Sequence, residues 1–327
     1  MAKLDLISVV VPIFNEAEVI REFYQRSTAA LSSAVTCDYE LIFVNDGSSD
    51  GSQEILRSLV AADDRVSVIK FSRNFGHQIA ISAGIDHARG DAVVVIDSDL
   101  QDPPEVIVDM IAKWREGFDV VYGVRASRKG ESWLKLWTAS VYYRLLKRMV
   151  KIDIPVDVGD FRLMSRRASA ELARLREKDR FVRGLVSWIG FPQAGVEYER
   201  DERFAGETKY PFRKMLKFAL DGVTSFSTLP LKLASWMGYA ASGFAFLYAL
   251  YVVAAKFMGY TVQGFATIMV AMMFLGGVQL ICLGIVGEYI GRIFNEIKPR
   301  PMYVVEECFG GLAAEPVRAH EPEPAGR

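Results

Sequence analysis

Residues 92–102 read AVVVIDSDLQD, a short apolar run that ends in a cluster of carboxylates. The first five side chains are small or β-branched, which is typical of a buried strand. Polar residues then end the strand, and Pro103-Pro104 begin a predicted helix that extends to Trp114, since proline fits the first turn of a helix. The stretch therefore predicts one strand–turn–helix repeat of an α/β protein.

The same alternation of strands and helices recurs on both sides of this stretch. The expected strands are 7–14, 39–44, 66–71 and 119–124, and the expected helices are 52–62 and 79–88. This spacing predicts a doubly wound, mostly parallel α/β sheet, in which ligands bind beyond the carboxyl ends of the strands. Asp46, Asp97 and Asp99 each follow the end of an expected strand. We therefore expect a binding site at that edge of the sheet.

The composition limits the class of protein. The 327 residues suit one α/β domain of roughly 200–250 residues with an appendage. With 39 basic and 40 acidic residues the net charge is -1, which argues against nucleic acid as a partner. Cys37, Cys282 and Cys308 are far apart in the sequence, which favours reduced thiols in the cytosol. The first apolar run is short and lacks a small-residue cleavage site, so it indicates a buried strand and not a signal peptide.

Charged residues are missing from two long stretches near the C-terminus. Residues 233–255 and 266–287 contain no Asp, Glu, Lys or Arg. Each stretch is long enough to cross a hydrocarbon core of about 30 Å at about 1.5 Å per helical residue. Basic residues precede the first stretch and follow the second, whereas the link between them carries only Lys256. The positive-inside rule then predicts a multi-pass protein of the cell (inner) membrane, with both termini and the large domain in the cytoplasm.

Two further segments, 131–149 and 211–226, have the pattern of basic amphipathic helices. For the first segment, packing on the domain as an ordinary surface helix is as good an interpretation as membrane contact. The second segment runs almost directly into a membrane stretch, which favours a place at the membrane interface. The chain beyond Gly310 is rich in Ala, Glu and Pro and is expected to be disordered.

Asp97 and Asp99 are separated by one residue at the end of a strand. Two carboxylates so placed can hold one divalent cation together with a diphosphate, and hard oxygen ligands suit Mg²⁺ or Mn²⁺. Such a cation would neutralise charge on a departing nucleotide diphosphate. An isolated Asp-x-Asp is common in loops and predicts little. Here it follows a hydrophobic strand and continues as LQDPPE, so its context favours a metal site.

Six motifs occur in order along the chain: VPIFNE at 11–16, VNDGSSDG at 44–51, SRNFG at 72–76, DSDLQDPPE at 97–105, GDFRL at 159–163 and RFAGETKY at 203–210. Together they resemble glycosyltransferase family 2, whose members have the GT-A fold. The last two motifs are similar to those of the polyprenyl-phosphate glycosyltransferases, the group that contains the dolichol-phosphate mannose synthases and the bactoprenol glucosyltransferases. The resemblance extends from about Ile7 through the second apolar stretch.

The resemblance implies roles for individual residues. The nucleotide-sugar donor would be bound by Pro12, Phe14, Glu16, Asp46, Asp97, Ser98, Asp99 and Arg125. The divalent cation would be held by Asp97, Asp99 and Gln101. The lipid phosphate and the diphosphate would be met near the membrane by Arg203, Lys209 and Arg213. Asp102 stands where some relatives carry histidine, which bears on the preference for one metal over another.

The expected catalytic residues are Asp160, Asp99 and Arg162. Asp160 corresponds to an acidic residue at the sugar that is often proposed as catalytic. A phosphate monoester has a second pKa near 6, so the acceptor is already a nucleophile at neutral pH. We therefore expect Asp160 to orient the sugar or the metal and not to act as a strict base. The two anionic substrates also require cationic charge, which Arg162 and the three membrane-proximal basic residues would supply, unless one or more of them is a solvated surface charge.

The sequence thus predicts a catalytic domain at 1–210, a juxtamembrane helix at 211–229, two transmembrane helices within 230–292 (about 233–255 and 266–288), and a partly disordered cytoplasmic tail at 293–327. The expected reaction is inverting transfer of a single hexose from a nucleotide-diphosphate sugar to polyprenyl (undecaprenyl or dolichyl) phosphate at the cytoplasmic membrane face. UDP-glucose is the first expected donor, with GDP-mannose, UDP-galactose and an N-acetylhexosamine donor as alternatives. Candidate partners are further copies of the chain in a homo-oligomer, a downstream flippase and a second glycosyltransferase.

Two other functions are compatible with parts of the sequence. A processive membrane polysaccharide synthase shares the fold, but it carries a Gln-x-x-Arg-Trp signature that this sequence lacks. A non-catalytic membrane scaffold of a lipid-linked sugar pathway would not need Asp97, Asp99 and Asp160, which are all present. His77 and His87 lie on or near an expected helix, where structural roles are favoured over metal binding.

Overall fold

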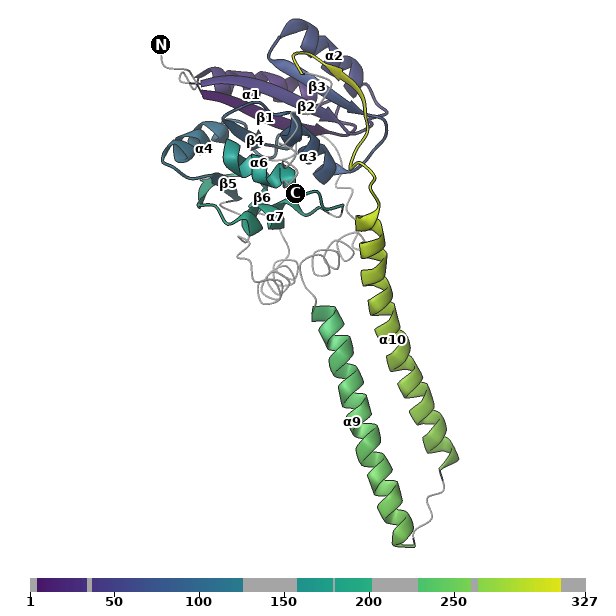
Figure 1. Ribbon diagram of the computed structural model, residues 1–327. Helices are drawn as coiled ribbons and strands as arrows, with labels where there is room; N and C mark the ends of the chain where they lie inside the picture. The colour runs from purple at the N-terminus through teal and green to yellow at the C-terminus, as the bar shows by residue number, and fades with distance from the viewer. Residues whose placement is uncertain are drawn as a thin grey trace, which may run out of the picture. The chain divides into compact units, whose positions relative to one another are not determined.

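The computed structural model of the protein describes residues 5–33, 37–125, 158–178, 180–201, 229–259 and 264–312. They fall into two compact units (Figure 1). The first, which we call the α/β unit, contains the described chain up to residue 201 together with the segment from Arg300 onward. The second, the helical unit, contains the described chain between residues 229 and 299. The predicted amphipathic helices at 131–149 and 211–226 lie outside the described residues.

The described strands of the α/β unit form a single eight-stranded sheet in the order β7-β5-β6-β4-β1-β2-β3-β8. The strands are β1 (Asp5–Ile13), β2 (Cys37–Asn45), β3 (Val66–Phe71), β4 (Ala92–Val95), β5 (Val120–Arg125), β6 (Val158–Ser165), β7 (Gln193–Tyr198) and β8 (Val305–Phe309). Strands β1 to β5 and β7 run in one direction, whereas β6 and β8 run in the opposite direction. The predicted mostly parallel α/β fold is therefore confirmed, with an antiparallel strand inserted between β4 and β5.

Along the chain, six described helices lie between the strands of the sheet. They are α1 (Ile20–Ser33), α2 (Ser52–Ala62), α3 (His77–His87) and α4 (Val106–Arg115), followed by α6 (Arg166–Arg174) and α7 (Val182–Ile189). Residues 7–13 of β1 and 39–45 of β2 are buried without interruption, as expected for central parallel strands with helices on both faces. Their side chains form the centre of the hydrophobic core.

Helix α3 lies directly on the sheet because Gly84 has no side chain. A Cβ atom at Gly84 would lie 2.1 Å from Cγ1 of Val10 in β1. The helix begins at His77, two residues before the predicted start, immediately after Gly76 with φ of 106°. This close packing fixes the helix whose first turn carries His77 and Gln78.

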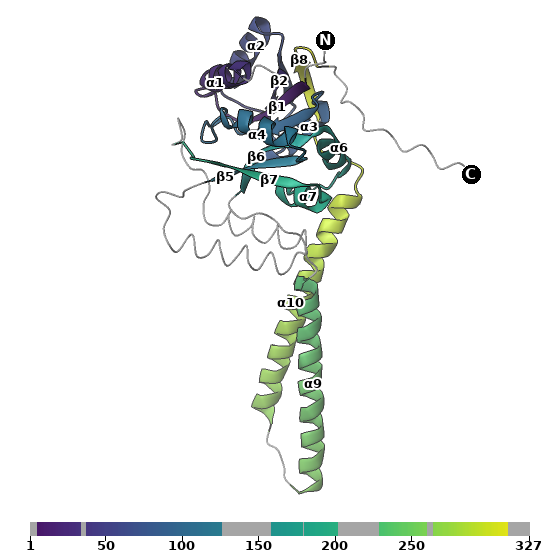
Figure 2. The same cartoon turned by 90° about the vertical axis from the view of Figure 1, so that its left-hand side faces the viewer.

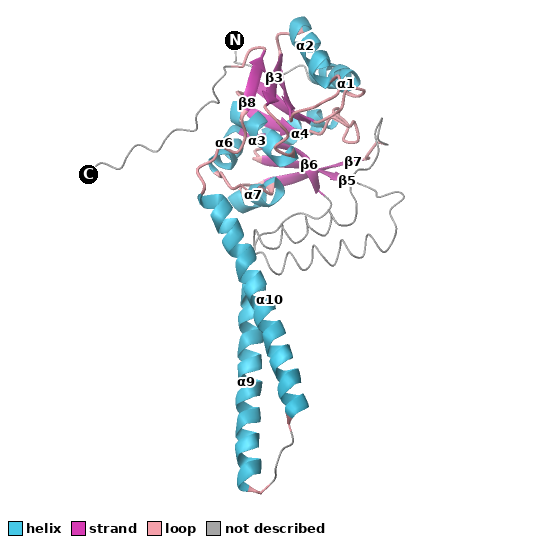
Figure 3. Ribbon diagram, turned by 90° about the vertical axis from the view of Figure 1, so that its right-hand side faces the viewer, coloured by secondary structure: helices cyan, strands magenta, loops and turns pink. Residues whose placement is uncertain are grey.

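Strand β8 is the main departure from the predicted division of the chain. It pairs antiparallel with β3 at the edge of the sheet, with Ile69 opposite Cys308 (Figures 2 and 3). The prediction placed 293–327 in a tail, but residues 305–309 complete the sheet of the α/β unit. The sequence of β8, VEECF, is too short for its alternation of apolar and polar residues to distinguish an edge strand from a tail.

The helical unit consists of α9 (Leu229–Phe257) and α10 (Phe265–Ile297), which pack against each other. The Cys282 thiol donates a hydrogen bond of 3.5 Å to the carbonyl oxygen of Ala234 across this contact. Segments Leu231–Phe257 and Val270–Ile297 are long and apolar enough to cross a membrane, and nearly all of their side chains are exposed in the chain as described. Two apolar helices that can form a hairpin are thus present as predicted, whereas their orientation across a membrane stays a prediction.

Candidate functional site

The turns that follow β1 and β2 are bound to each other. The backbone N–H of Asn15 donates to Oγ of Ser48 at 3.0 Å, and the backbone N–H of Ser49 donates to Oδ1 of Asn15 at 2.8 Å. Asn15 has φ of 57°, a left-handed conformation that asparagine tolerates better than most residues. The turn leaves Phe14 45% exposed beside the buried Pro12. An exposed aromatic ring at this edge is accessible to a planar ligand, and the donor role of Phe14 stays a prediction.

Asp46 fastens the SRNFG loop, residues 72–76, to the end of β2. Its buried carboxylate accepts hydrogen bonds from the backbone N–H groups of Phe75 at 2.6 Å and Gly76 at 2.9 Å. Burial raises the pKa of Asp46, although these two hydrogen bonds oppose the rise. Gly47 is required beneath the loop, since its φ is 70° and a Cβ atom there would lie 2.6 Å from the carbonyl carbon of Arg73. Asp46 therefore has a structural role in the loop in addition to its predicted contact with the donor.

Asp97 and Asp99 lie directly after β4, as the sequence predicts. The turn between them and the following helix is tight, with Leu100 at φ of 59° and the backbone N–H of Gln101 donating to Oδ1 of Asp99 at 3.1 Å. Oδ1 of Asp97 is buried without a hydrogen-bond partner. Burial raises the pKa of Asp97 to about 6, and the negative charges of Asp160, Asp102 and Asp99 add to the rise while His77 opposes it. The negative charges crowded around Asp97, which His77 only partly offsets from 3.4 Å, are an environment that a bound cation would stabilise.

Gln101 and Asp102 are engaged by basic and phenolic side chains. Oε1 of Gln101 accepts a hydrogen bond of 2.6 Å from Nη2 of Arg200. The buried carboxylate of Asp102 accepts a hydrogen bond from the Tyr198 hydroxyl and lies 3.7 Å from Nη2 of Arg125. To bind a cation through Oε1, Gln101 would have to give up its hydrogen bond from Arg200. The role of Gln101 as a metal ligand therefore stays a prediction. The ion pair with Asp102 holds Arg125, a predicted donor-binding residue, beside the acidic turn.

The donor set around Asp97 and Asp99 suits a hard divalent cation only in part. Among the described residues, no three His, Cys, Asp or Glu side chains converge in a geometry that could hold a metal ion. Mg²⁺ is commonly held by one or two carboxylates together with substrate phosphates. The pair therefore fits a cation that arrives with a diphosphate, and Mg²⁺ and Mn²⁺ both remain candidates.

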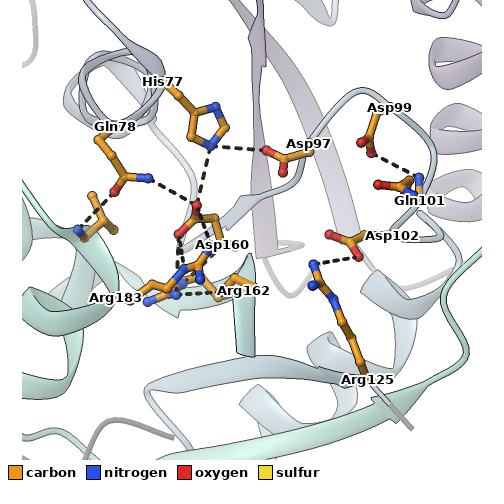
Figure 4. A network of polar contacts seen from close by, with 12 residues as sticks. His77, Gln78, Asp97, Asp99, Gln101, Asp102, Arg125, Asp160, Arg162 and Arg183 are labelled. Atoms are coloured by element: carbon orange, nitrogen blue, oxygen red, sulfur yellow. Dashed lines mark hydrogen bonds and ion pairs between the residues drawn. The ribbon is translucent and has the colours of Figure 1, made fainter. Parts of the chain in front are cut away.

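Asp160 on β6 is held by side chains from two helices (Figure 4). Arg183 of α7 donates from Nε to Oδ1 at 2.9 Å and from Nη2 to Oδ2 at 3.1 Å. Gln78 of α3 donates from Nε2 to Oδ2 at 3.1 Å. Gln78 also accepts a hydrogen bond of 3.0 Å from the backbone N–H of Val182, which joins the first turns of both helices. The carboxylate is thus fixed in one orientation.

His77 lies between the two acidic parts of the site. Its Nε2 atom is 3.4 Å from Oδ1 of Asp97 and 3.5 Å from Oδ2 of Asp160 (Figure 4). Burial lowers the pKa of His77, but the hydrogen bond to Asp160 and the charge of Asp97 outweigh it and raise the pKa to about 9. Burial likewise raises the pKa of Asp160, but the charge of Arg183 and the hydrogen bond from His77 outweigh it and hold the pKa well below its usual value. An ionised, fully engaged carboxylate is a weak base, so its geometry favours orientation over proton abstraction.

Arg162 lies in a different environment from the one that its predicted role requires. Its side chain is only 4% exposed, and its guanidinium donates to the backbone carbonyls of Gly159 at 2.9 Å and Asp160 at 3.3 Å. Burial lowers its pKa to about 10. Asp160 and Arg162 are two residues apart on β6 and share one face of the sheet. In this structure Arg162 supports the backbone at Asp160 and lies 3.9 Å from the Asp160 carboxylate, so its predicted catalytic role stays a prediction.

The remaining predicted residues are distributed as follows. Ser98 is buried within the acidic turn, and Glu16 follows the exposed Phe14. The backbone N–H of Glu16 donates to Oγ of Ser52 at 3.1 Å, which ties it to the start of α2. The predicted lipid-phosphate residues Arg203, Lys209 and Arg213 lie outside the described residues.

Sequence reasoning gave His77 only a structural role and missed Gln78 and Arg183. The first two directly follow the SRNFG motif and open α3, so proximity to a motif at a strand end was the available signal. Arg183 lies in the apolar helix α7, 23 residues beyond Asp160, and no local pattern marks it. Its role becomes visible only when the fold brings α7 to β6.

Two family models match this chain. Residues 8–173 match glycosyl transferase family 2, and residues 229–293 match the GtrB C-terminal hairpin. The chain belongs to glycosyltransferase family 2. The match covers β1 to β6 and α6 up to residue 173, and so includes Asp97, Asp99 and Asp160. Together with the eight-stranded sheet it confirms the predicted GT-A-type α/β fold.

Similar proteins match this glycosyltransferase over nearly its whole length. The Bacillus subtilis (strain 168) protein named "Uncharacterized glycosyltransferase YkcC" is 56% identical over 304 residues, covering 93% of this chain and 94% of its own. The "SfII prophage-derived bactoprenol glucosyl transferase" of Shigella flexneri is 42% identical over 306 residues, covering 93% and 99%. The "Prophage bactoprenol glucosyl transferase homolog" of Escherichia coli (strain K12) is 41% identical over 301 residues, covering 92% and 98%. These matches confirm the resemblance to the polyprenyl-phosphate glycosyltransferase group.

Proposed function

We propose that this family 2 glycosyltransferase transfers one hexose from a nucleotide-diphosphate sugar to polyprenyl phosphate, with inversion, at the cytoplasmic face of the membrane. Relatives that cover 92–93% of the chain are named bactoprenol glucosyl transferases, which supports a polyprenyl phosphate acceptor and makes UDP-glucose the first donor to test. The pair of apolar helices α9 and α10 supports a substrate whose chain lies in a bilayer. The basic residues that flank them favour the cytoplasmic face.

The reaction needs one bond to form and one to break. An oxygen of the acceptor phosphate attacks the anomeric carbon, and the bond from that carbon to the donor diphosphate breaks, with its electron pair leaving on the nucleoside diphosphate. A single displacement inverts the anomeric centre. Because the acceptor phosphate is largely dianionic at neutral pH, no protein group has to remove a proton. The absence of such a need agrees with an Asp160 whose carboxylate is ionised and bound by Arg183.

Asp97 and Asp99 would hold the divalent cation against the donor diphosphate, with Gln101 as a third ligand if it exchanges Arg200. When bound, the cation would neutralise the charge that develops on the leaving diphosphate. Arg125, ordered by Asp102, would contribute a further positive charge beside the donor. Asp160 would orient the sugar, since its position is fixed by Arg183 and Gln78.

One observation carries the proposal: Asp97 and Asp160, which the sequence places 63 residues apart, lie on either side of His77 Nε2 at 3.4 Å and 3.5 Å. The expected metal and diphosphate residue is thus next to the expected sugar residue. A donor whose diphosphate meets Asp97 would place its sugar toward Asp160, and the acceptor would approach from the other side of the anomeric carbon.

The proposal is tested with a panel of radiolabelled donors, undecaprenyl phosphate and the detergent-solubilised full chain. We expect labelled lipid from one donor, UDP-glucose first, with loss of product on chelation and recovery with Mg²⁺ or Mn²⁺. Asp99→Asn should lower the rate by at least about 100-fold, because the cation and the leaving group lose a charged ligand. Asp109→Asn, which changes an exposed carboxylate of α4, is the matched control and should keep the rate.

The alternatives give different results in the same assay. Long, repeatedly extended saccharides would indicate a processive synthase, and no turnover with any donor would favour a non-catalytic scaffold. Full activity of Asp99→Asn in chelator would contradict the metal assignment.

A further inference from the structure

Residues 300–312, which we call the return segment, follow α10 in the chain and lie in the α/β unit. Besides β8, this segment makes contacts through Tyr303 and Val304, which precede the strand. Its Tyr303 ring stacks on Phe71 with ring centroids 5.1 Å apart. Its Val304 carbonyl accepts a hydrogen bond of 3.1 Å from the backbone N–H of Ser72. Both partners lie where β3 ends and the SRNFG loop begins.

The SRNFG loop is therefore anchored at both ends. At its start, Ser72 is bound by Val304, and at its end Phe75 and Gly76 are bound by Asp46. Phe71 also contacts Phe75 edge to face at 5.6 Å, so Tyr303 is linked to the far end of the loop through one aromatic ring. The loop leads directly into α3, whose first turn enters the site.

Tyr303 also holds the opposite end of α3. Its hydroxyl donates to Oδ2 of Asp86 at 2.9 Å, and Nη1 of Arg176 binds the same oxygen at 2.7 Å. Asp86 is buried in the last turn of α3, and burial together with the charge of Asp86 raises the pKa of Tyr303, which keeps its hydroxyl a donor. A hydrogen bond to a buried charge is stronger than a neutral one.

Helix α3 spans 11 residues and behaves as one rigid element over about 15 Å. Its last turn contacts Tyr303, and its first turn carries Gln78, which donates to Asp160, and His77, which lies beside Asp97. Helix α3 packs closely on β1 because Gly84 has no side chain. A displacement of the last turn of this rigid helix would therefore also displace its first turn.

We propose that Tyr303 is a positioning residue of the transferase site: it holds the SRNFG loop and α3 in the place where Gln78 and His77 meet Asp160. The inference rests on the proposed function for its effect on turnover, but its structural part does not. The ion pairs of β8, Lys70–Glu306 with β3 and Arg57–Glu307 with α2, are largely exposed and do not reach α3. Positioning is thus assigned to Tyr303 and not to β8 as a whole.

The test compares Tyr303→Phe with Tyr24→Phe in the full chain. The phenylalanine at 303 keeps the stacking on Phe71 and removes only the hydrogen bond to Asp86. The control removes an equivalent tyrosine–aspartate hydrogen bond, Tyr24 to Asp63 at 2.8 Å, from the α1–α2 region of the same unit. Amide hydrogen exchange of peptides covering 72–87 is measured with the thermal midpoint, and kcat and the donor KM are measured with the lipid acceptor.

We expect Tyr303→Phe to speed amide exchange in 72–87 by about tenfold and Tyr24→Phe to leave it unchanged, because only the first variant loses a hydrogen bond to α3. Turnover of Tyr303→Phe should fall about tenfold at a thermal midpoint close to that of the control. Unchanged exchange in 72–87, or equal loss of turnover in both variants, would overturn the inference. If exchange in 72–87 changes but the wild type has no transferase activity, the structural role of Tyr303 is supported and only the proposed function is rejected.

A second variant covers the case in which Tyr303→Phe does not fold. Asp86→Asn weakens the acceptor that Tyr303 and Arg176 share, so exchange in 72–87 should rise in the same peptides. If Asp86→Asn changes exchange uniformly across the sheet, α3 is not held locally and the inference fails.

Discussion

Arg183 binds Asp160 through two parallel contacts, Nε to Oδ1 at 2.9 Å and Nη2 to Oδ2 at 3.1 Å. A fork of this kind fixes the plane of the carboxylate as well as its position. The contact joins α7 to β6, so the orientation of the expected sugar-binding residue depends on a helix that the motifs do not include. Two predictions follow from this pair, one for each partner.

Replacing Asp160 with Asn should lower kcat by about 100-fold, since an amide cannot be held by Arg183 in the same way and the donor sugar loses its orientation. The pKa of Asp160 is held well below 3.8, so the carboxylate stays ionised at every pH above that value. The pH–rate profile of the wild type between pH 5 and pH 9 should therefore contain no step that belongs to Asp160. An acidic limb in this range that disappears in Asp160→Asn would show that the residue acts as a base.

Arg183→Lys should be nearly as damaging as Arg183→Gln, although lysine keeps the charge. An ammonium group cannot make two parallel hydrogen bonds to one carboxylate, so Asp160 loses its fixed plane. We expect kcat to fall by about 10- to 100-fold with a smaller change in the donor KM. Arg174→Lys, which alters an exposed arginine that pairs with Glu171 on α6, is the control. Wild-type kcat in Arg183→Lys would mean that charge alone suffices at this position.

Asp160 and Arg183 also show which parts of the site could be predicted from the sequence and which could not. Strands β1 to β5, and the position of Asp97 and Asp99 after β4, followed from apolar runs and the residues that end them, because a buried parallel strand has consecutive apolar side chains. Strands β6 and β7 were not predicted from the sequence. The orientation of Asp160 could not be predicted, since it depends on Arg183, which the chain brings back through α6 and α7.

Two further features, the burial of Arg162 and the pairing of β8, could not be predicted from the sequence for related reasons. Arg162 was expected to supply cationic charge to the two anionic substrates, but its sequence position did not indicate that its side chain is buried on β6 and donates to backbone carbonyls. Strand β8 pairs with β3 across more than 230 residues, and pairing between distant segments leaves no periodic signal in either one. The interpretation of 305–309 as tail was wrong for that reason.

A pH-dependent contribution to stability is expected from Asp63. Hydrogen bonds from Arg65 lower its pKa to about 2, with burial opposing and Tyr24 assisting. A carboxyl group with a depressed folded-state pKa stabilises the fold fully above its unfolded value of 3.8 and loses that contribution as the pH falls toward 2. After allowance for solvent screening, Asp63→Asn should lower the free energy of unfolding by about 1 kcal/mol at pH 7 and by clearly less at pH 3.

The measurement for Asp63 is chemical unfolding of wild type and variant at both pH values. Asp64→Asn changes the neighbouring exposed carboxyl group and serves as the control. A difference between wild type and Asp63→Asn that is the same at pH 7 and pH 3 would show that Arg65 does not stabilise the ionised form.

Removal of residues 300–327 should destabilise the α/β unit, whereas removal of 313–327 alone should not. The longer deletion takes away β8, the stacking of Tyr303 on Phe71 and the cation–π contact of Arg57 over Phe309 at 4.1 Å. It also leaves β3, with the sequence VSVIKF, as an unprotected edge that invites association with other chains.

We expect the longer deletion to cost roughly 3 kcal/mol of stability, which corresponds to a fall of about 6–12 °C in the thermal midpoint. A thermal melt followed with a measurement of particle size in detergent checks both effects. A chain cut after Leu229 would lose β8 together with α9 and α10, so poor use of a long-chain acceptor by that form could not be assigned to the membrane helices. If the chain ending at Pro299 melts at the wild-type temperature and stays monodisperse, β8 is dispensable, and a chain cut after Leu229 would then test the contribution of α9 and α10 alone.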